Sequence, residues 1–285
     1  MKDPALNRYS VEEVQEQLKK EIFPVRGITM LGAAAFEFKK PSNAIAVALH
    51  AGSRVRSGLN GVMQVGAVDR SREEDLYTDA LVEDFPLVMV ARDSRFEYDL
   101  NWEEAHCIYD YQKKKWGHQV WSRPLTNSER DETIAKYREF HRLLDMMIEY
   151  VLSRVGPVLL FDIHSFCYQR EDRVHWWTDN KPEINVGTRY IHRDYFAAQV
   201  EAFMRMNSGI ILEGKRLRIA ENEIFPGGFL TRKYAAMHPH TVCVLAVEYK
   251  KIYMDEWSGK LYPEKLDLLK RSLLLTKDQI PRIKG

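Results

Sequence analysis

The stretch Val158-Leu159-Leu160-Phe161-Asp162-Ile163-His164-Ser165 decides the fold. Its four leading apolar residues predict a strand buried on both faces, as strands are in a parallel or mixed sheet covered by helices. The stretch then turns polar at Asp162, His164 and Ser165. Ligands of open α/β sheets lie outside the carboxyl ends of the strands. An aspartate and a histidine are therefore placed for chemistry here, although a histidine bonded to a loop carbonyl would give the same pattern.

Three further apolar stretches end in the same way. Residues 44–50 end at His50, residues 242–248 end at Glu248, and residues 87–91 lead into Arg92-Asp93-Ser94-Arg95. If these stretches are neighbouring strands of one sheet, their polar ends converge. Two histidines, several carboxylates and an arginine then share one cleft.

The remaining pattern predicts helices and loops around such a sheet. Ser10 and Glu13 form a capping box before an amphipathic helix that ends before Pro24, and a long helix runs from Asn127 or Ser128 to Gly156. Further predictions are a hairpin or edge strand in 27–38, a short helix near 72–79, helices around 196–203 and 264–276, and polar loops at 53–69, 171–187 and 221–229. Residues 1–285 are thus expected to form a single α/β domain, with an insertion-like aromatic segment at about 103–126.

Composition narrows the functional classes. The 285 residues carry 42 Lys and Arg against 41 Asp and Glu, so no global charge attracts nucleic acid or an anionic membrane. Three widely spaced cysteines favour a reducing compartment over a disulfide framework. The charged N-terminus resembles no signal peptide, and no apolar run approaches the ~18 residues of a membrane span. We expect a soluble, cytoplasmic protein; its oligomeric state stays open.

Three local features have alternative interpretations. Lys113, Lys114 and Lys115 lie among aromatic residues, which can indicate single-stranded nucleic acid binding, but a solvated hairpin tip is favoured in a neutral protein. His141 lies on the apolar stripe of the long helix and is interpreted as packing. Cys167 is interpreted as a small buried filler rather than a reactive thiol.

The strand-end residues match the parts of a catalytic zinc site. Two imidazoles and one carboxylate leave a fourth position open for water or substrate. His50 and His164 supply the imidazoles, and the acidic pair Glu74 and Asp75 supplies a carboxylate. A separate carboxylate, Glu248, is available as general base, and Arg95 is available to stabilise an oxyanion.

Here the chain resembles the N-formylglutamate amidohydrolase family, which is related in architecture to zinc carboxypeptidases and aspartoacylase. The resemblance covers about residues 45–259 and rests on an ordered set of motifs. These are His50-Ala51-Gly52, Glu74-Asp75, residues 94–101 (SRFEYDLN), Asp162-Ile163-His164-Ser165, Gly227-Gly228 and Glu248. It implies a mixed, eight-stranded-type sheet flanked by helices, with a zinc-carboxypeptidase-like (phosphorylase/hydrolase-like) architecture. It also implies one Zn²⁺ and hydrolysis of a C–N amide bond.

The resemblance also implies roles for single residues. His50 and His164 match the zinc imidazoles, Glu248 the general base, Arg95 the group that polarises the scissile carbonyl, and Asn101 a substrate-binding residue. Gly228 belongs to a glycine pair that permits close approach of a ligand. Zinc carboxypeptidases take their third ligand three residues after the first histidine, where this chain has Ser53. The third ligand is therefore expected at Glu74 or Asp75, with a slight preference for Glu74.

One position departs from the family pattern. The asparagine of the relatives is followed by an arginine that binds the substrate carboxylate, whereas this chain has Trp102. An indole cannot make the two-bond contact of a guanidinium. Either another arginine replaces it, with Arg170 the first candidate before Arg189 and Arg232, or the pocket accepts an aromatic or apolar group. We expect poor hydrolysis of N-formylglutamate and preference for a different amide.

Three functions follow as hypotheses. The first is a zinc-dependent amidohydrolase or peptidase acting on a small N-acyl or N-formyl amino acid or a short peptide. The second is an ester or carbohydrate N-deacylase with the same metal chemistry. The third, suggested by Trp102, is a non-catalytic metabolite-binding or regulatory protein on the same scaffold.

Overall fold

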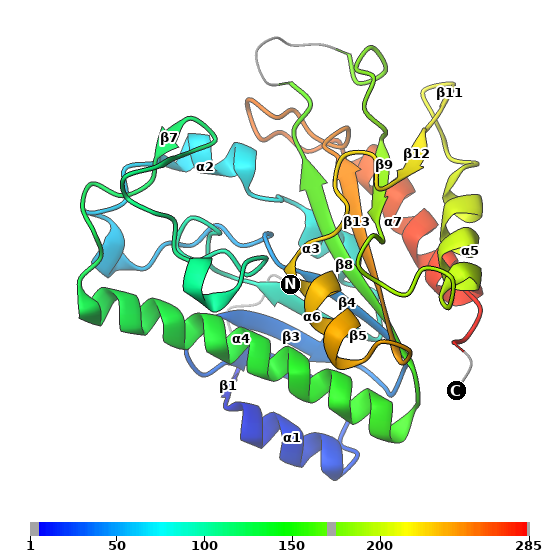
Figure 1. Cartoon of the computed structure of the whole chain (residues 1–285), viewed down its shortest axis with the longest axis horizontal. Coiled ribbons are helices and arrows are strands. Elements are labelled where there is room, and N and C mark those ends of the chain that lie inside the picture. Colours follow the sequence, from blue (N-terminus) through cyan, green and yellow to red (C-terminus); the bar gives the residue numbers. More distant parts are fainter. Residues whose placement is uncertain (1–5, 170–174, 284–285) are drawn as a thin grey trace.

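The computed structural model describes residues 6–169 and 175–283. Within these residues, nine strands form one mixed sheet in the order β1-β2-β3-β5-β4-β8-β13-β9-β12, and two short ribbons lie outside it (Figure 1). The strands of the sheet are β1 (Arg8–Tyr9), β2 (Val25–Thr29), β3 (Ala34–Phe38), β4 (Ala44–Ala48), β5 (Leu87–Ala91), β8 (Val158–Phe166), β9 (Ile184–Gly187), β12 (Ile219–Glu221) and β13 (Val242–Lys250). The ribbons are β6 (Lys114–Lys115) with β7 (His118–Gln119), and β10 (Ile211–Leu212) with β11 (Lys215–Arg216).

The four predicted apolar stretches are neighbouring strands. β5 pairs with β4, β4 with β8, and β8 with β13, and all three pairings are parallel. Every residue of β4, β5 and β8 is buried, as expected for strands covered on both faces. Their carboxyl ends therefore lie at one edge of the sheet, which confirms the predicted convergence of polar residues.

The flanking strands were predicted less completely. The hairpin expected in residues 27–38 is present, because β2 and β3 pair antiparallel. The loop predicted over residues 171–187 is wrong at its end, where β9 pairs antiparallel with β13 and is fully buried. β9 is only four residues long and contains Asn185 and Gly187, so its apolar character is too brief to stand out.

Seven α-helices and two 3₁₀ turns complete the described chain. They are α1 (Val11–Lys19), η1 (Ser57–Leu59), α2 (Ala67–Glu73), α3 (Thr78–Val82), η2 (Glu104–His106), α4 (Asn127–Arg154), α5 (Ala197–Asn207), α6 (Phe229–Met237) and α7 (Pro263–Gln279). Capping boxes at Ser10–Glu13 and Thr126–Glu129 start α1 and α4. α6 was not predicted, and it begins at Phe229, where a loop was expected to end.

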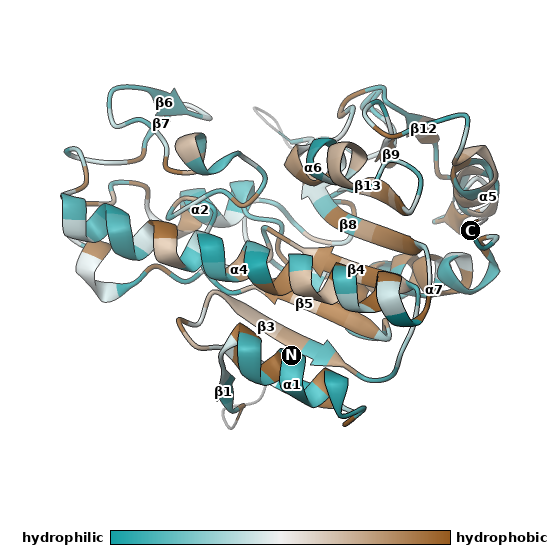
Figure 2. Ribbon diagram, turned by 60° about the horizontal axis from the view of Figure 1, so that its bottom comes forward, coloured by the Kyte–Doolittle hydropathy of each residue, from teal (hydrophilic) through white to brown (hydrophobic). Residues whose placement is uncertain are grey.

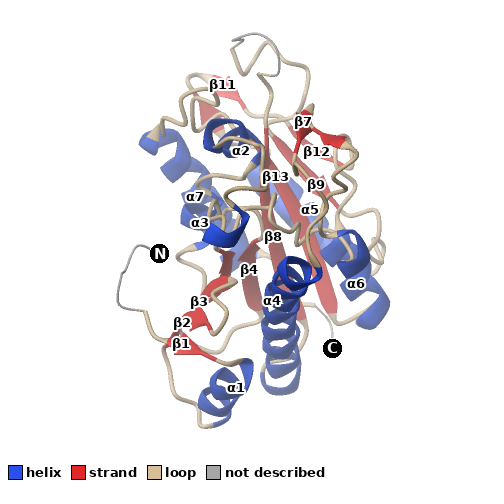
Figure 3. Cartoon of the chain, turned by 90° about the vertical axis from the view of Figure 1, so that its left-hand side faces the viewer, coloured by secondary structure: helices blue, strands red, loops and turns tan. Residues whose placement is uncertain are grey.

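The helices cover both faces of the sheet. α3 and α7 lie on one side, while α4 and α6 lie on the other (Figure 3). The central strands are hydrophobic, whereas the helices show mixed surfaces (Figure 2). Among the described residues, no helix is both long and apolar enough to cross a membrane.

The aromatic segment at 103–126 packs on a hydrophobic cluster separate from the main core. That cluster consists of Leu59, Val62, Val65, Phe96, Val120 and Trp121. The segment contains η2 and the β6–β7 hairpin, which confirms the hairpin predicted around the lysine run. Phe96 links it to the sheet edge, because Phe96 follows Arg95 in the loop after β5.

Candidate metal centre and active site

Three buried side chains meet at the carboxyl ends of the central strands. They are His50, just after β4; Asp75, in the turn between α2 and α3; and His164, in β8. One ligand atom from each lies within 4.8 Å of the others. Asp75 Oδ2 is 3.2 Å from His164 Nδ1 and 3.4 Å from His50 Nδ1. The arrangement could hold a metal ion.

Backbone hydrogen bonds hold Asp75 in this place. The Asp75 N–H donates to the His50 carbonyl at 2.9 Å. The Asp75 carbonyl in turn accepts from both the N–H and the hydroxyl of Thr78, the first residue of α3. The carboxylate is thus fixed by the strand end on one side and by the start of a helix on the other.

A second carboxylate orients each imidazole. His50 Nε2 lies 2.7 Å from Asp99 Oδ1, and His164 Nε2 lies 2.9 Å from Asp162 Oδ1. Asp162 reaches His164 because residues two apart on a strand share a face. A neutral imidazole has one N–H and one acceptor nitrogen. With His50 Nε2–H directed to Asp99, the Nδ1 lone pair of His50 is left for a metal, as in other histidine metal sites. His164 Nε2 makes no hydrogen bond within the described residues, and His164 Nδ1 lies 3.2 Å from Asp75 Oδ2.

Asp99 is the most extensively bonded group of the site. Besides His50, it accepts hydrogen bonds from Arg95 Nη2 at 2.9 Å, the Tyr109 hydroxyl and the Asn101 N–H. Burial opposes ionisation of Asp99, but the charges of Arg95 and His50 outweigh it and hold its pKa well below its usual range. Asp99 therefore stays ionised and fixes the His50 ring.

The carboxylates and imidazoles of the centre shift one another's pKa values. Burial opposes ionisation of Asp75, yet the neighbouring imidazoles of His164 and His50 hold the pKa of Asp75 below its usual range. Burial likewise opposes protonation of His164, yet Asp162, Asp75 and Glu248 raise its pKa. Both shifts have the same physical cause: buried carboxylates that favour a positive charge between them.

Unpartnered polar atoms show that a cation fits here. Within residues 6–169 and 175–283, His50 Nδ1 and Asp75 Oδ1 are buried and have no hydrogen-bond partner, although Arg95 Nη1 lies 4.0 Å from Asp75 Oδ1. Buried polar atoms are nearly always paired, so two orphans at one point indicate a missing partner. Two imidazole nitrogens and a carboxylate are a donor set that zinc accepts. The residues present therefore fit the metal that the sequence predicts.

Asp75, rather than Glu74, faces the two imidazoles, which corrects the preference for Glu74. The Glu74 carboxylate accepts a hydrogen bond from the Ser94 hydroxyl and lies 3.6 Å from Arg70 Nε. Glu74 has extended backbone angles (φ −78°, ψ 148°) at the end of α2. Successive side chains of an extended segment point in opposite directions, so only one of the two acidic residues can face the site.

Glu248 lies beside the metal cluster. β13 and β8 pair Glu248 with His164 in register, so both side chains point to the same face. Glu248 lines a cavity of about 190 Å³ together with His50, Asp75 and His164. Burial raises the pKa of Glu248 to about 7, although the charge of His164 opposes this. The structure thus places a carboxylate at the predicted position of the general base.

Arg95 also lines this cavity. Its Nη2 is bonded to Asp99, and its Nη1 lies 4.0 Å from Asp75 Oδ1. The guanidinium lies over the ring of Trp116, 4.6 Å from the centroid, and its Nε finds no hydrogen-bond partner in the part of the chain that the structure describes. Arg95 is therefore held at the wall of the cavity with one donor uncommitted.

Asn101 and Gly228 form one unit. Asn101 Oδ1 accepts the N–H of Phe229 at 2.7 Å, and Asn101 lines the cavity. A Cβ on residue 228 would lie 2.1 Å from Asn101 Oδ1. Position 228 must therefore be glycine, because Asn101 lies against it at the start of α6. The sequence predicted a close approach of a ligand at this glycine, but the group that approaches it is Asn101.

The arginines predicted to replace the missing carboxylate contact do not line the cavity in the described part of the chain. Arg170 lies outside the described residues. Arg189 is exposed, and Arg232 lies 5.6 Å from the ring centroid of Tyr190. Neither of these two is among the residues around His50 and His164.

Sequence reasoning missed several residues of the site. Asp99, Asp162 and Tyr109 were not assigned as partners of the histidines. The position of Asp162 could have been predicted, since it lies two residues before His164 on one strand and therefore shares a face with it. Lys251 is a buried residue of the cavity wall, and its Nζ donates to the carbonyls of Arg72 and Glu74. Nothing in the sequence pattern indicated this role.

Comparison with known proteins agrees with this geometry. Residues 42–254 match the model of the family described as N-formylglutamate amidohydrolase. The crystal structure of N-formylglutamate amidohydrolase from Ralstonia eutropha JMP134 is similar, with a TM-score of 0.64 and 20% identity over 82% of this chain and 91% of that chain. A gene product of Agrobacterium tumefaciens has a TM-score of 0.61 and 18% identity over 87% and 95%. No curated protein sequence matches.

Proposed function

Because this chain belongs to the N-formylglutamate amidohydrolase family, we propose that it is a zinc-dependent hydrolase of an N-acyl amino acid or peptide-like amide. The observation that carries the proposal is the buried cluster of His50, Asp75 and His164, with two orphaned ligand atoms, at the base of a cavity that also contains Glu248. The matched segment includes all four residues.

Zinc would be held by the Nδ1 atoms of His50 and His164 and by the Asp75 carboxylate. When bound, it would supply a lowered water pKa and polarisation of the scissile carbonyl. Asp99, bonded to His50 Nε2, would keep that imidazole in the tautomer that presents Nδ1, and Asp162 lies 2.9 Å from His164 Nε2. Their buried negative charge also strengthens the imidazoles as ligands.

The other cavity residues have separate tasks. Glu248 takes a proton from the attacking water and delivers it to the leaving nitrogen. Arg95 donates to the oxyanion that develops on the carbonyl oxygen. Asn101, fixed by the N–H of Phe229, uses its amide NH₂ to orient the substrate.

The function is tested by metal replacement and a substrate screen. The purified protein is stripped with a chelator and reloaded with Zn²⁺, and hydrolysis of N-formyl and N-acetyl amino acids and dipeptides is followed by release of free amine. We expect about one zinc per chain, activity lost on stripping and restored on reloading, and N-formylglutamate among the poorer substrates. Zinc binding without turnover of any amide, combined with tight binding of an amino acid, would favour the non-catalytic alternative.

Arg95→Ala tests the oxyanion role. The barrier should rise by about 2–4 kcal/mol, mostly through kcat, as when other oxyanion donors are removed. Because Arg95 also holds Asp99, zinc content has to be measured in the same preparation. An effect on KM alone, at full zinc occupancy, would make Arg95 a substrate-binding residue instead.

A further inference from the structure

Lys115 differs from the two lysines before it. Lys113 and Lys114 are exposed, whereas Lys115 is half-buried. Lys114 and Lys115 are consecutive in β6, so their side chains point to opposite faces of the hairpin. The expectation of a solvated hairpin tip holds for Lys114 but not for Lys115.

The Lys115 ammonium is surrounded by aromatic rings. Its Nζ lies 5.2 Å from the ring centroid of Trp102, 5.1 Å from that of Tyr109 and 4.7 Å from that of Trp116. Among the described residues, no carboxylate forms an ion pair with it. Burial lowers the pKa of Lys115, since a half-buried ammonium loses water without gaining a full counter-charge.

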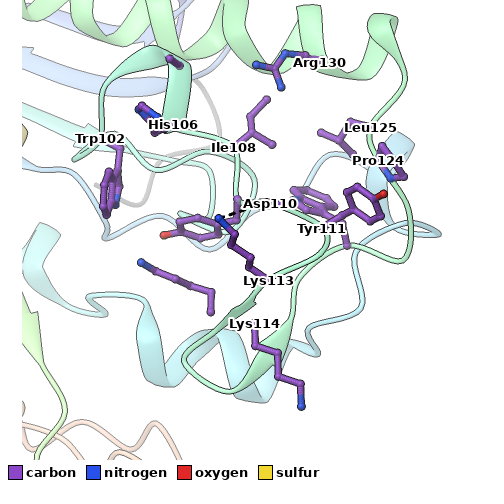
Figure 4. A pocket seen from close by; sticks show the side chains of 14 residues that line it. Trp102, His106, Ile108, Asp110, Tyr111, Lys113, Lys114, Pro124, Leu125 and Arg130 are labelled. Carbon is purple, nitrogen blue, oxygen red and sulfur yellow. Dashed lines mark ion pairs between the residues drawn. The ribbon is translucent and has the colours of Figure 1, made fainter.

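Lys115 lies between two cavities. Together with Trp102, Tyr109 and Tyr111 it lines an open cavity of about 560 Å³ in the aromatic segment. Figure 4 shows Trp102 at one side of this cavity and Tyr111, Pro124 and Leu125 at the other. The adjoining Trp116 lines the cavity that contains His50, His164 and Glu248.

Tyr109 connects the aromatic cavity to the metal cluster through hydrogen bonds. The Tyr109 ring faces the aromatic cavity, while its hydroxyl bonds to Asp99, the partner of His50. Arg95 on the other side is already bonded to Asp99. Lys115 is thus a cation that contacts aromatic rings and, among the described residues, has no ion-pair partner, and it lines the cavity next to the residue, Trp116, that lines the metal-cluster cavity.

We propose that Lys115 binds the carboxylate of the substrate and that the aromatic cavity takes its side chain. The substrate class is then an N-acyl amino acid with an apolar or aromatic side chain. This assignment of a substrate class rests on the proposed function, the hydrolysis of an amide. A carboxylate beside the Lys115 ammonium would supply the counter-charge that Lys115 lacks, and the rings of Trp102 and Tyr109 would cover the apolar part.

The first experiment measures binding without turnover. Zinc-stripped protein is titrated with 3-phenylpropanoate and with 3-phenylpropan-1-ol, followed by tryptophan fluorescence and calorimetry. Stripping removes the metal as an alternative site for the carboxylate. Lys115→Met should weaken 3-phenylpropanoate binding about 10- to 100-fold, the worth of one charged hydrogen bond, and leave the alcohol within about twofold. Lys115→Arg should restore most of the difference.

Matched variants separate recognition from structure. Lys260→Met, at an exposed lysine that lines neither of the two cavities, should bind both probes like the wild type. If Lys115→Met unfolds at a lower temperature than the wild type, Lys115→Gln, which keeps a polar side chain, is used in its place. Equal loss of both probes in Lys115→Gln and Lys115→Arg would show that the lysine only supports the aromatic cluster, and unchanged carboxylate binding would equally overturn the proposal.

The second experiment uses the zinc-loaded enzyme with N-formylphenylalanine and N-formylphenylalaninamide. Lys115→Met should raise KM for the acid about 10- to 100-fold, with kcat within about threefold, and leave KM for the amide unchanged. Equal KM changes for acid and amide would contradict carboxylate recognition. Absence of hydrolysis with both substrates would instead count against the proposed function, while the binding experiment still decides the role of Lys115.

Discussion

Asp75→Asn is expected to weaken zinc binding by about 100-fold or more, whereas Glu74→Gln should bind zinc like the wild type. Removal of groups that merely orient a ligand costs roughly 10- to 100-fold in metal affinity, so loss of a charged ligand should cost at least as much. Of the two acidic residues, Asp75 is the one that lies within 3.4 Å of both imidazoles. Glu74 is bonded to Ser94 instead.

The two variants form a matched pair. Each replaces one buried carboxylate by the amide of the same shape, and the residues are adjacent, so general effects on the turn after α2 are shared. Zinc affinity is measured by competition with a chromophoric chelator, and thermal unfolding of the stripped proteins gives the cost to the fold. Stronger zinc loss in Glu74→Gln than in Asp75→Asn would overturn the assignment made from this geometry.

The same pair of residues shows where sequence reasoning stops. The apolar runs ending at His50, His164 and Glu248 predicted the central strands, because strands buried on both faces have little freedom in composition. The resemblance to a known family then brought these residues into one site. Neither source decides between adjacent acidic residues, because that choice depends on backbone angles at one turn. Here Glu74 is extended and Asp75 is anchored to the His50 carbonyl.

The roles of residues that act through tertiary contacts could also not be predicted from the sequence. Alternation in a strand indicates that Lys114 and Lys115 face opposite ways, but not which of them meets the aromatic rings. That depends on how the hairpin folds back over Trp102 and Tyr109, which lie along the chain between β5 and β6. The sequence shows that Trp102 departs from the family pattern. The structure adds that Lys115 lies beside Trp102, so a cation is present near the position where the relatives have an arginine.

The largest effect on turnover is expected from Glu248→Gln. General-base catalysis contributes roughly 10²- to 10⁴-fold, so kcat should fall by that factor while zinc content stays at one per chain. Among the described residues, Glu248 has no hydrogen bond or ion pair, although it lies in register with His164 and lines the cavity. A carboxylate kept partly buried without a partner does not stabilise the fold.

Its removal should therefore cost no stability. Glutamine takes away a buried charge next to Asp75, so thermal unfolding of the stripped Glu248→Gln protein should occur at the same or a higher temperature, as is common when a strained site is relieved. Glu37→Gln in β3, away from the cavity, provides the control for a lost charge on a strand. A variant that keeps near wild-type kcat on the best substrate of the screen would exclude Glu248 as the base. A variant that loses zinc or unfolds early would instead make Glu248 part of the metal centre.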